Sequence, residues 1–152
     1  ESVSQVEPLL RLLAWAEGHI ELNWHTLYVN AQRLFDMGRA DKAGSFMEKA
    51  VSTMISVYTE DPNASYENLV TMGDIVHDRY NDSEVAERIY RLGISLEPQK
   101  PGAYYGLAAS LQAQGDEQSA LQLVEDYIEH YGPAEEIVEA QQILQNALAE
   151  QE

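Results

Sequence analysis

The 152-residue sequence contains no cysteine and few basic residues. The absence of cysteine excludes disulfides, thiolate catalysis and cysteine-ligated zinc or iron–sulfur centres. The sequence has nine Lys and Arg and 26 Asp and Glu, which gives a net charge of −17. Phosphate backbones and anionic lipid surfaces both bind through Lys and Arg, so we expect no nucleic-acid partner and no direct membrane contact by this segment.

Lysine is especially scarce, with only Lys42, Lys49 and Lys100. Acid excess with little lysine is typical of proteins in a salt-rich cytoplasm, where screening removes self-repulsion. An acidic, soluble protein from an ordinary cell is the alternative, and the composition leaves both open. Between compartments, we favour the cytoplasm.

Long apolar runs are missing as well, and no window approaches the roughly 18 residues of a membrane-spanning helix. No signal peptide is visible. The printed chain begins with Glu1 instead of Met. We therefore expect a processed or excised piece of a longer protein, and any anchor would lie elsewhere in that parent.

What the sequence does contain is an internal repeat. Ala86-x-x-x-Tyr90 is followed 34 residues later by Ala120-x-x-x-Val124, and each motif follows a turn signal, at Asn81 and Gly115. Apolar residues also recur at helical spacing before each turn, which indicates amphipathic helices joined in hairpins. That pattern reads Leu69-x-x-Met72-Gly73-x-x-Val76 in one copy and Tyr104-x-x-Leu107-Ala108-x-x-Leu111 in the other.

The turn residues and small residues predict where helices end, which residues cap them and where two helices pack closely. Asn81 and Gly115 can adopt the left-handed conformation that ends a helix, while Ser83 and Asp116 are placed to cap the next one. Small residues let the two helices of a hairpin approach closely. They are Gly73, Ala108, Ala43, Ala86 and Ala120.

An earlier copy is looser. Leu27-x-x-Asn30-Ala31-x-x-Leu34 leads to a turn at Gly38, but Ala43 lies 43 residues before Ala86. We expect a longer second helix reaching Tyr58 and a connector at Asp61-Pro62-Asn63. Asn30 stands where a large apolar residue is expected.

Further helices are expected at both ends, for about eight in total. The first covers Val6 to Glu21, with Pro8 in its first turn and an apolar stripe that includes Leu9, Leu12 and Leu13. The last covers Ala134 to Ala149. A final helix with a polar outer face keeps a stack of repeats soluble.

This pattern resembles the tetratricopeptide repeat (TPR), whose period is 34 and whose signature is W-x2-L-G-x2-Y, A-x3-F, P. No copy here has the tryptophan. The resemblance implies an all-α fold, a right-handed α-α superhelix of about three hairpins plus flanking helices. It would form a single domain over 1–152, with repeats at 24–62, 65–98 and 101–133 and a capping helix at 134–150.

The resemblance also implies a concave groove lined by the first helix of each hairpin, which holds a peptide or a partner's helix. TPR domains that clamp a C-terminal carboxylate present Lys and Arg there, whereas 104–114 has neither, which argues against such a clamp. Asp74 and Asp78 favour a neutral or basic ligand. The predicted groove residues are His25, Tyr28, Gln32, Val70, Asp74, His77, Asp78, Tyr105 and Gln112.

A metal site and an enzyme active site are the two other kinds of site to consider. Asp74-x-x-His77-Asp78 places three potential metal ligands on neighbouring helix faces, but no fourth ligand is marked and a solvated face is favoured. We therefore expect no metal and no cofactor. The sequence has no nucleophile elbow, phosphate-binding glycine loop or H-E-x-x-H motif, so no enzyme activity is expected.

The function predicted from the sequence is a protein-interaction module for a neutral to basic protein or peptide. The alternative is a self-assembling element that forms a homodimer through its terminal helices. The stripe at Leu9, Leu12 and Leu13 distinguishes them, because a large exposed apolar patch requires a partner.

Overall fold

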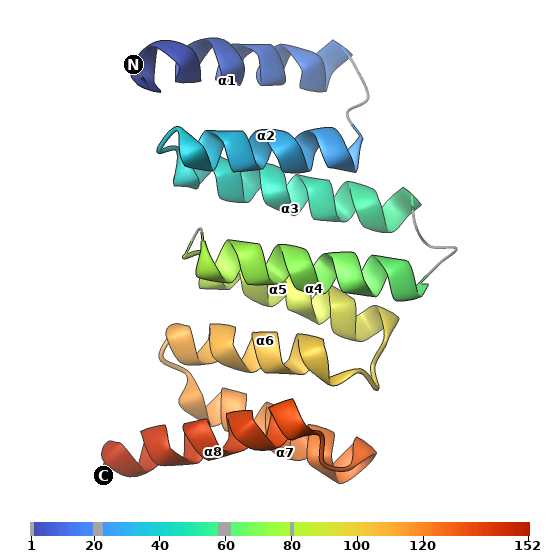
Figure 1. The fold of residues 1–152 in the computed structure, drawn as a ribbon, viewed down its shortest axis with the longest axis vertical. Helices are drawn as coiled ribbons and strands as arrows, with labels where there is room; N and C mark the ends of the chain where they lie inside the picture. Colours follow the sequence, from blue (N-terminus) through green and yellow to red (C-terminus); the bar gives the residue numbers. More distant parts are fainter. Residues whose placement is uncertain (1, 20–22, 58–61, 80) are drawn as a thin grey trace. The chain divides into compact units, whose positions relative to one another are not determined.

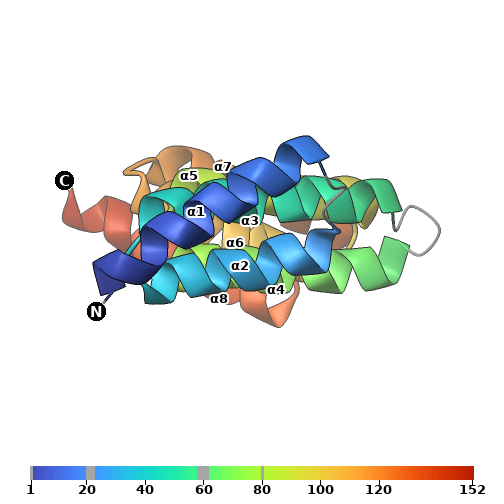
Figure 2. The same cartoon turned by 90° about the horizontal axis from the view of Figure 1, so that it is seen from above.

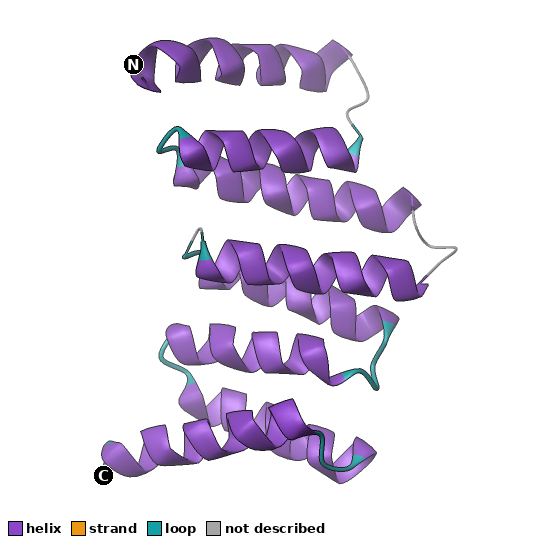
Figure 3. Ribbon diagram, in the orientation of Figure 1, coloured by secondary structure: helices purple, strands orange, loops and turns teal. Residues whose placement is uncertain are grey.

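A computed structural model describes residues 2–19, 23–57, 62–79 and 81–152. In these ranges the chain forms eight α-helices and no strand (Figure 3). Contacts group the chain into two compact units, 1–60 and 61–152, and each is described by itself. The single domain expected over 1–152 stays a prediction.

Unit 1 contains α1 (Ser2–His19), α2 (Trp24–Asp36) and α3 (Ala40–Val57). The α2–α3 hairpin turns at Gly38, which adopts the expected left-handed φ of 81°. Asn23 caps α2, since its side chain accepts a hydrogen bond from the Thr26 amide at 2.8 Å. The core of the hairpin is apolar and completely buried, with Leu27, Ala31, Leu34, Ala43 and Met47.

The first unit differs from expectation in two details. α1 begins at Ser2, so Pro8 lies inside the helix and not in its first turn. Asn30 is accommodated because its amide donates to the Thr26 carbonyl at 2.8 Å, one turn back on the same helix. The expected helix ends at Glu21 and Tyr58 fall outside the described residues.

Unit 2 contains α4 (Pro62–Asp78), α5 (Ser83–Leu96), α6 (Pro101–Ala113), α7 (Glu117–Tyr131) and α8 (Glu135–Glu150). Successive helices pack as antiparallel neighbours, and α6 also contacts α4 and α8 (Figure 1). Viewed from above, α5 and α7 lie on one side of this unit and α4 and α8 on the other, with α6 between them (Figure 2).

Capping in unit 2 corrects one sequence prediction. Asp116 caps α7 as expected, and its carboxylate accepts from the Ser119 amide at 3.2 Å. For α5 the cap is Asp82, not Ser83, since Asp82 accepts from the Val85 amide at 3.2 Å. Asn81 takes the left-handed turn with φ 56°, so the residue directly after it occupies the cap position.

α4 also begins earlier than the repeat expected at 65. Its first residue is Pro62, which was expected to lie in a connector. Proline suits the first helical position, because that position needs no amide hydrogen and the fixed φ matches a helix. α8 spans Glu135–Glu150, and its role as a capping helix stays a prediction.

Tyr90 organises the middle of unit 2. Its ring, 2% exposed, lies between Gly73 of α4 and Gly106 of α6. A Cβ atom on Gly73 would lie 2.6 Å from the ring, and one on Gly106 would lie 2.3 Å from it. The two glycines therefore open a slot through which Tyr90 of α5 reaches past both helices.

Candidate functional site

A small hollow lies between α6 and α8 in unit 2. It has a volume of about 40 Å³. Tyr105 and Gln112, both predicted to line a groove, contribute to its wall, and Ile143 of α8 is 44% exposed. We call this site the α6–α8 hollow; its lining residues are Tyr105, Ala108, Ala109, Gln112, Ala140, Ile143 and Leu144.

Adjacent residues on α6 face different neighbours. Tyr105 faces α8, whereas the ring of Tyr104 contacts Tyr127 of α7, with ring centroids 4.8 Å apart. Neighbouring helix positions diverge by about 100°, so the two tyrosines lie on different sides of α6.

The predicted residues of α4 form a polar row beside a half-buried Val70. Tyr90 donates its hydroxyl to Asp74 Oδ1 at 2.5 Å. His77 Nδ1 lies 2.9 Å from Oδ1 of Asp78. Asp74 reaches the surface, but packing around its carboxyl removes hydration and raises its pKa, while the bond from Tyr90 opposes that shift.

These interactions decide whether Asp74, His77 and Asp78 could together bind a metal ion. The Asp74 carboxylate accepts from a phenol, and His77 pairs with Asp78. In the described part of the chain, no three His, Asp or Glu side chains are arranged to hold a metal ion. The row presents negative charge and hydrogen-bond acceptors.

The other predicted site residues lie on α2 in unit 1. His25 is exposed, Tyr28 and Gln32 are half-buried, and Gln32 Nε2 donates to the Tyr28 hydroxyl at 3.3 Å. They belong to a different compact unit from the α6–α8 hollow. A groove that combines residues of both units therefore stays a prediction.

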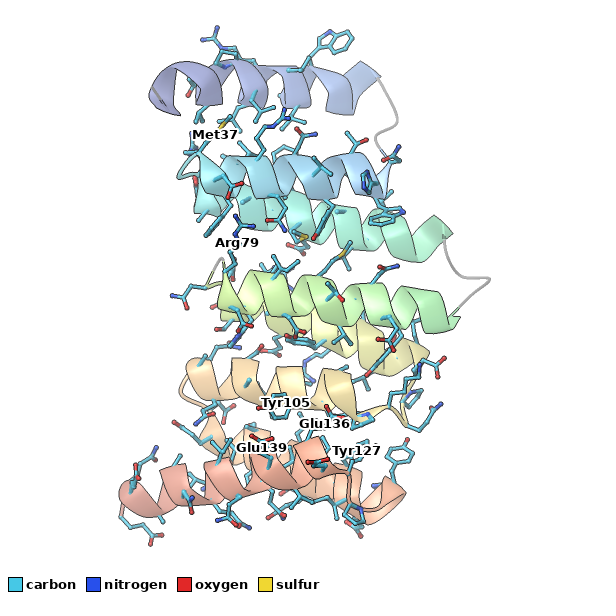
Figure 4. All side chains as sticks on the ribbon, viewed as in Figure 1. Met37, Arg79, Tyr105, Tyr127, Glu136 and Glu139 are labelled. Atoms are coloured by element: carbon cyan, nitrogen blue, oxygen red, sulfur yellow. The ribbon has the colours of Figure 1, made fainter. Side chains whose placement is uncertain are left out.

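Sequence reasoning missed the contribution of α8. That helix was expected to cap the repeats or, in the alternative, to take part in a homodimer, yet Ala140, Ile143 and Leu144 line the hollow. The available signal was the apolar side of α8, which includes Ile137, Ala140, Ile143 and Leu144 at helical spacing. Glu136 and Glu139, exposed on the same helix, lie near Tyr105 in the space between α6 and α8 (Figure 4).

The charge around the hollow has one sign. Residues 101–152, which include α6, α7 and α8, contain no Lys or Arg and ten Asp or Glu. Lys100 lies just before α6, where its amine is 3.7 Å from Glu67 and 4.8 Å from the centre of the Tyr66 ring. A ligand approaching α6 and α8 therefore meets a negative potential.

Among the residues that the structure covers, no helix is both long and apolar enough to cross a membrane. Among the described residues, the large apolar side chains that remain exposed include Leu12, Trp15 and Tyr131.

Comparison with known proteins identifies the fold. No protein-family profile matches the sequence, and a search of curated proteins finds no match. A solved structure described as "First TPR of Spaghetti (RPAP3) bound to HSP90 peptide SRMEEVD" is similar, with a TM-score of 0.50 and 20% sequence identity. The alignment covers 84% of this chain and 94% of that one. The TPR-like, all-helical fold predicted from the sequence is thereby confirmed.

Proposed function

We propose that this protein is an interaction module that holds a peptide or a partner's helix against α4, α6 and α8. The α6–α8 hollow is the observation that carries the proposal. Its aromatic and apolar walls, with Gln112 at hand for hydrogen bonding, resemble the mixed lining of ligand sites. The similar TPR structure was solved with a bound peptide, which supports this mode of use. The proposal includes no catalytic step.

The proposed partner is neutral to basic. Asp74 and Asp78 on α4 and Glu136 and Glu139 on α8 flank the α6 surface, and no Lys or Arg occurs after Lys100. Opposite charge on a partner raises its association rate and selects against acidic competitors. The peptide named for the similar structure, SRMEEVD, has three acidic residues and one basic residue. We therefore expect this chain not to bind it.

Selection from a random twelve-residue peptide library tests the proposal. We expect enriched sequences to be rich in Lys and Arg, and calorimetry to measure their affinity. Replacing Tyr105 by Ala or Ile143 by Ser should each weaken binding about tenfold, because central anchors commonly contribute more than 1 kcal/mol.

Leu92→Ala is the matched control. Leu92 is 37% exposed and lies on α5, away from the lining residues of the hollow. Its truncation should leave affinity unchanged. Selection of acidic peptides, or affinity that survives both Tyr105→Ala and Ile143→Ser, would show that binding is directed elsewhere. Tyr28→Ala separately tests whether α2 contributes to the proposed groove.

A homodimer is the second candidate, and it is favoured by exposed apolar side chains on α1. In the stripe that distinguishes the two hypotheses, Leu13 is buried and Leu9 half-buried, but Leu12 is 59% exposed and nearby Trp15 51%. Light scattering should return twice the chain mass of 17.1 kDa if this face pairs. Leu12→Glu should then restore the monomer. A monomer of the unaltered chain at all concentrations would remove this candidate.

A further inference from the structure

A second concave site lies on unit 2, between α6 and α7. Its volume is about 250 Å³, larger than that of the α6–α8 hollow. Tyr104 and Tyr105 project from α6 in different directions, so the two sites use different sides of that helix. We call it the tyrosine cleft; it is lined by Tyr104, Leu123, Asp126, Tyr127, His130 and Tyr131.

Two of the three tyrosine rings in the cleft are held by hydrogen bonds. Tyr104 donates its hydroxyl to the Pro98 carbonyl at 2.8 Å, and Tyr127 donates to the Gln99 carbonyl at 2.7 Å. The ring centroids of Tyr127 and Tyr131 are 5.1 Å apart. Packing within the protein covers only part of the surface of these rings, since Tyr131 remains 49% exposed. Rings fixed in this way can receive a ligand without a further loss of their own rotational freedom.

The charge at the tyrosine cleft is negative. Asp126 contributes a carboxylate, and the Gln122 amide donates to its Oδ1 at 2.8 Å. His130 has its Nδ1 2.8 Å from the Asp126 carbonyl, which orients the imidazole along α7. No Lys or Arg occurs between residues 101 and 152, and the amine of the preceding residue, Lys100, lies 3.7 Å from Glu67. Aromatic faces beside a carboxylate attract a cation that can rest on a ring and pair with the acid.

We propose that the tyrosine cleft receives the arginine or lysine side chain of a partner protein. The side chain's aliphatic stem would cover Leu123 and the exposed ring of Tyr131, and its charged end would face Asp126. A proline-rich segment could also pack on tyrosines, but it would gain nothing from the carboxylate. The site is separate from the α6–α8 hollow and does not depend on the function proposed for that hollow.

The test is an NMR titration of the isotopically labelled full chain with the peptide acetyl-Gly-Arg-Gly-Arg-Gly-amide. We expect saturable amide shifts at residues 123–131, distinct from any shifts at the lining residues of the α6–α8 hollow. The same peptide with citrulline in place of arginine keeps the shape but loses the charge, and it should give no saturable shift. Tyr131→Ala should weaken binding about fivefold, as expected for one cation–aromatic contact.

Further variants distinguish specific binding in the tyrosine cleft from the effects of misfolding and of the overall negative charge. Tyr131→Phe keeps the ring and should keep the affinity, while Asp126→Asn should weaken binding several-fold. Glu129→Gln removes a similar exposed charge on α7 outside the lining residues and should have little effect. Ile143→Ser in the α6–α8 hollow should also leave this titration unchanged, which distinguishes the two sites.

Three results would overturn the proposal. One is shifts spread over the whole acidic surface, with equal losses for Glu129→Gln and Asp126→Asn. Another is unchanged affinity in a folded Tyr131→Ala variant. The third is tighter binding of a hexaproline peptide at the same amides, which would identify the tyrosine cleft as a proline site instead.

Discussion

At the scale of single residues, Tyr90 shows how a large buried ring is accommodated between two neighbouring helices. A ring 2% exposed reaches between two helices because each of them carries a glycine where the ring passes. Its hydroxyl then meets Asp74, so the polar end of the side chain is satisfied. One residue of α5 thus links the core to the polar row of α4.

Gly106→Ala tests this slot. A Cβ 2.3 Å from the Tyr90 ring forces the ring or a helix to move, and overpacking of this kind costs about 3 kcal/mol of unfolding free energy. Urea denaturation followed by circular dichroism measures the loss. Gly93→Ala is the control, because its Cβ would lie an ordinary 3.5 Å from Ala103 Cβ. That variant should gain about 0.5 to 1 kcal/mol from better helix propensity. Equal effects for the two would contradict a tight slot.

Tyr90→Phe isolates the hydrogen bond to Asp74. We expect a loss of about 2 kcal/mol at pH 7, since the acceptor is charged. Burial, and then the bond to Asp74, raise the pKa of Tyr90 well above its usual value of 10. The folded state therefore keeps this proton while the unfolded chain loses it, so stability from Tyr90 declines as pH rises above 10.

The difference between the original chain and Tyr90→Phe should consequently shrink between pH 10 and pH 11 in paired urea titrations. Tyr66, Tyr104 and Tyr127 also have raised pKa values, but they are present in both proteins and cancel in the difference. A gap that widens with pH would contradict this assignment.

At the scale of helices, most boundaries follow from local rules. Gly38, Asn81 and Gly115 all adopt the positive φ that their turn positions predicted. The cap of α5 was placed one residue late, because serine and aspartate are both good caps and the sequence alone does not choose between Asp82 and Ser83. The conformation of Asn81 makes that choice.

Asp82→Ala should therefore cost about 1 kcal/mol of unfolding free energy, the usual contribution of an N-cap. Ser83→Ala, at the adjacent first helical residue, should change stability by less than about 0.5 kcal/mol. Thermal unfolding of the two variants in parallel makes the comparison. The opposite order would return the cap to Ser83.

The sequence predicted which residues share a helix face, but not which helices meet. Tyr105 and Gln112 were expected to face outward from α6 because they lie off the buried stripe. The contribution of Ile143 depends on how α8 crosses α6, and that crossing is set by tertiary packing. The tyrosine cleft likewise joins Tyr104 to residues some twenty positions later, a distance that helical periodicity does not address.

At the scale of the whole molecule, charge is the dominant feature. A net charge of −17 on 152 residues repels itself in the compact state more than in the extended chain. Dissolved salt screens this repulsion, with a Debye length of about 10 Å at 0.1 M and about 3 Å at 1 M. A protein adapted to a salt-rich cytoplasm and an acidic protein from an ordinary cell differ in how strongly their stability depends on that screening.

The urea midpoint should therefore rise between 0.05 and 1 M sodium chloride. A variant combining Glu129→Gln, Glu139→Gln and Glu150→Gln, all at exposed positions, should show a smaller rise and a higher midpoint at low salt. Circular dichroism at each salt concentration records both curves. A flat response of the unaltered chain would remove the argument for adaptation to salt.

The stretch without bases in α6, α7 and α8 also decides how the protein is digested and labelled. Trypsin cuts after Lys and Arg, and it cuts poorly when proline follows, as it does at Lys100-Pro101. Every peptide bond from Leu92 to Glu152 should then survive trypsin, whether the chain is folded or not. Amine-reactive cross-linkers likewise find no lysine after Lys100, so mapping a partner onto either proposed site calls for carboxyl-directed chemistry.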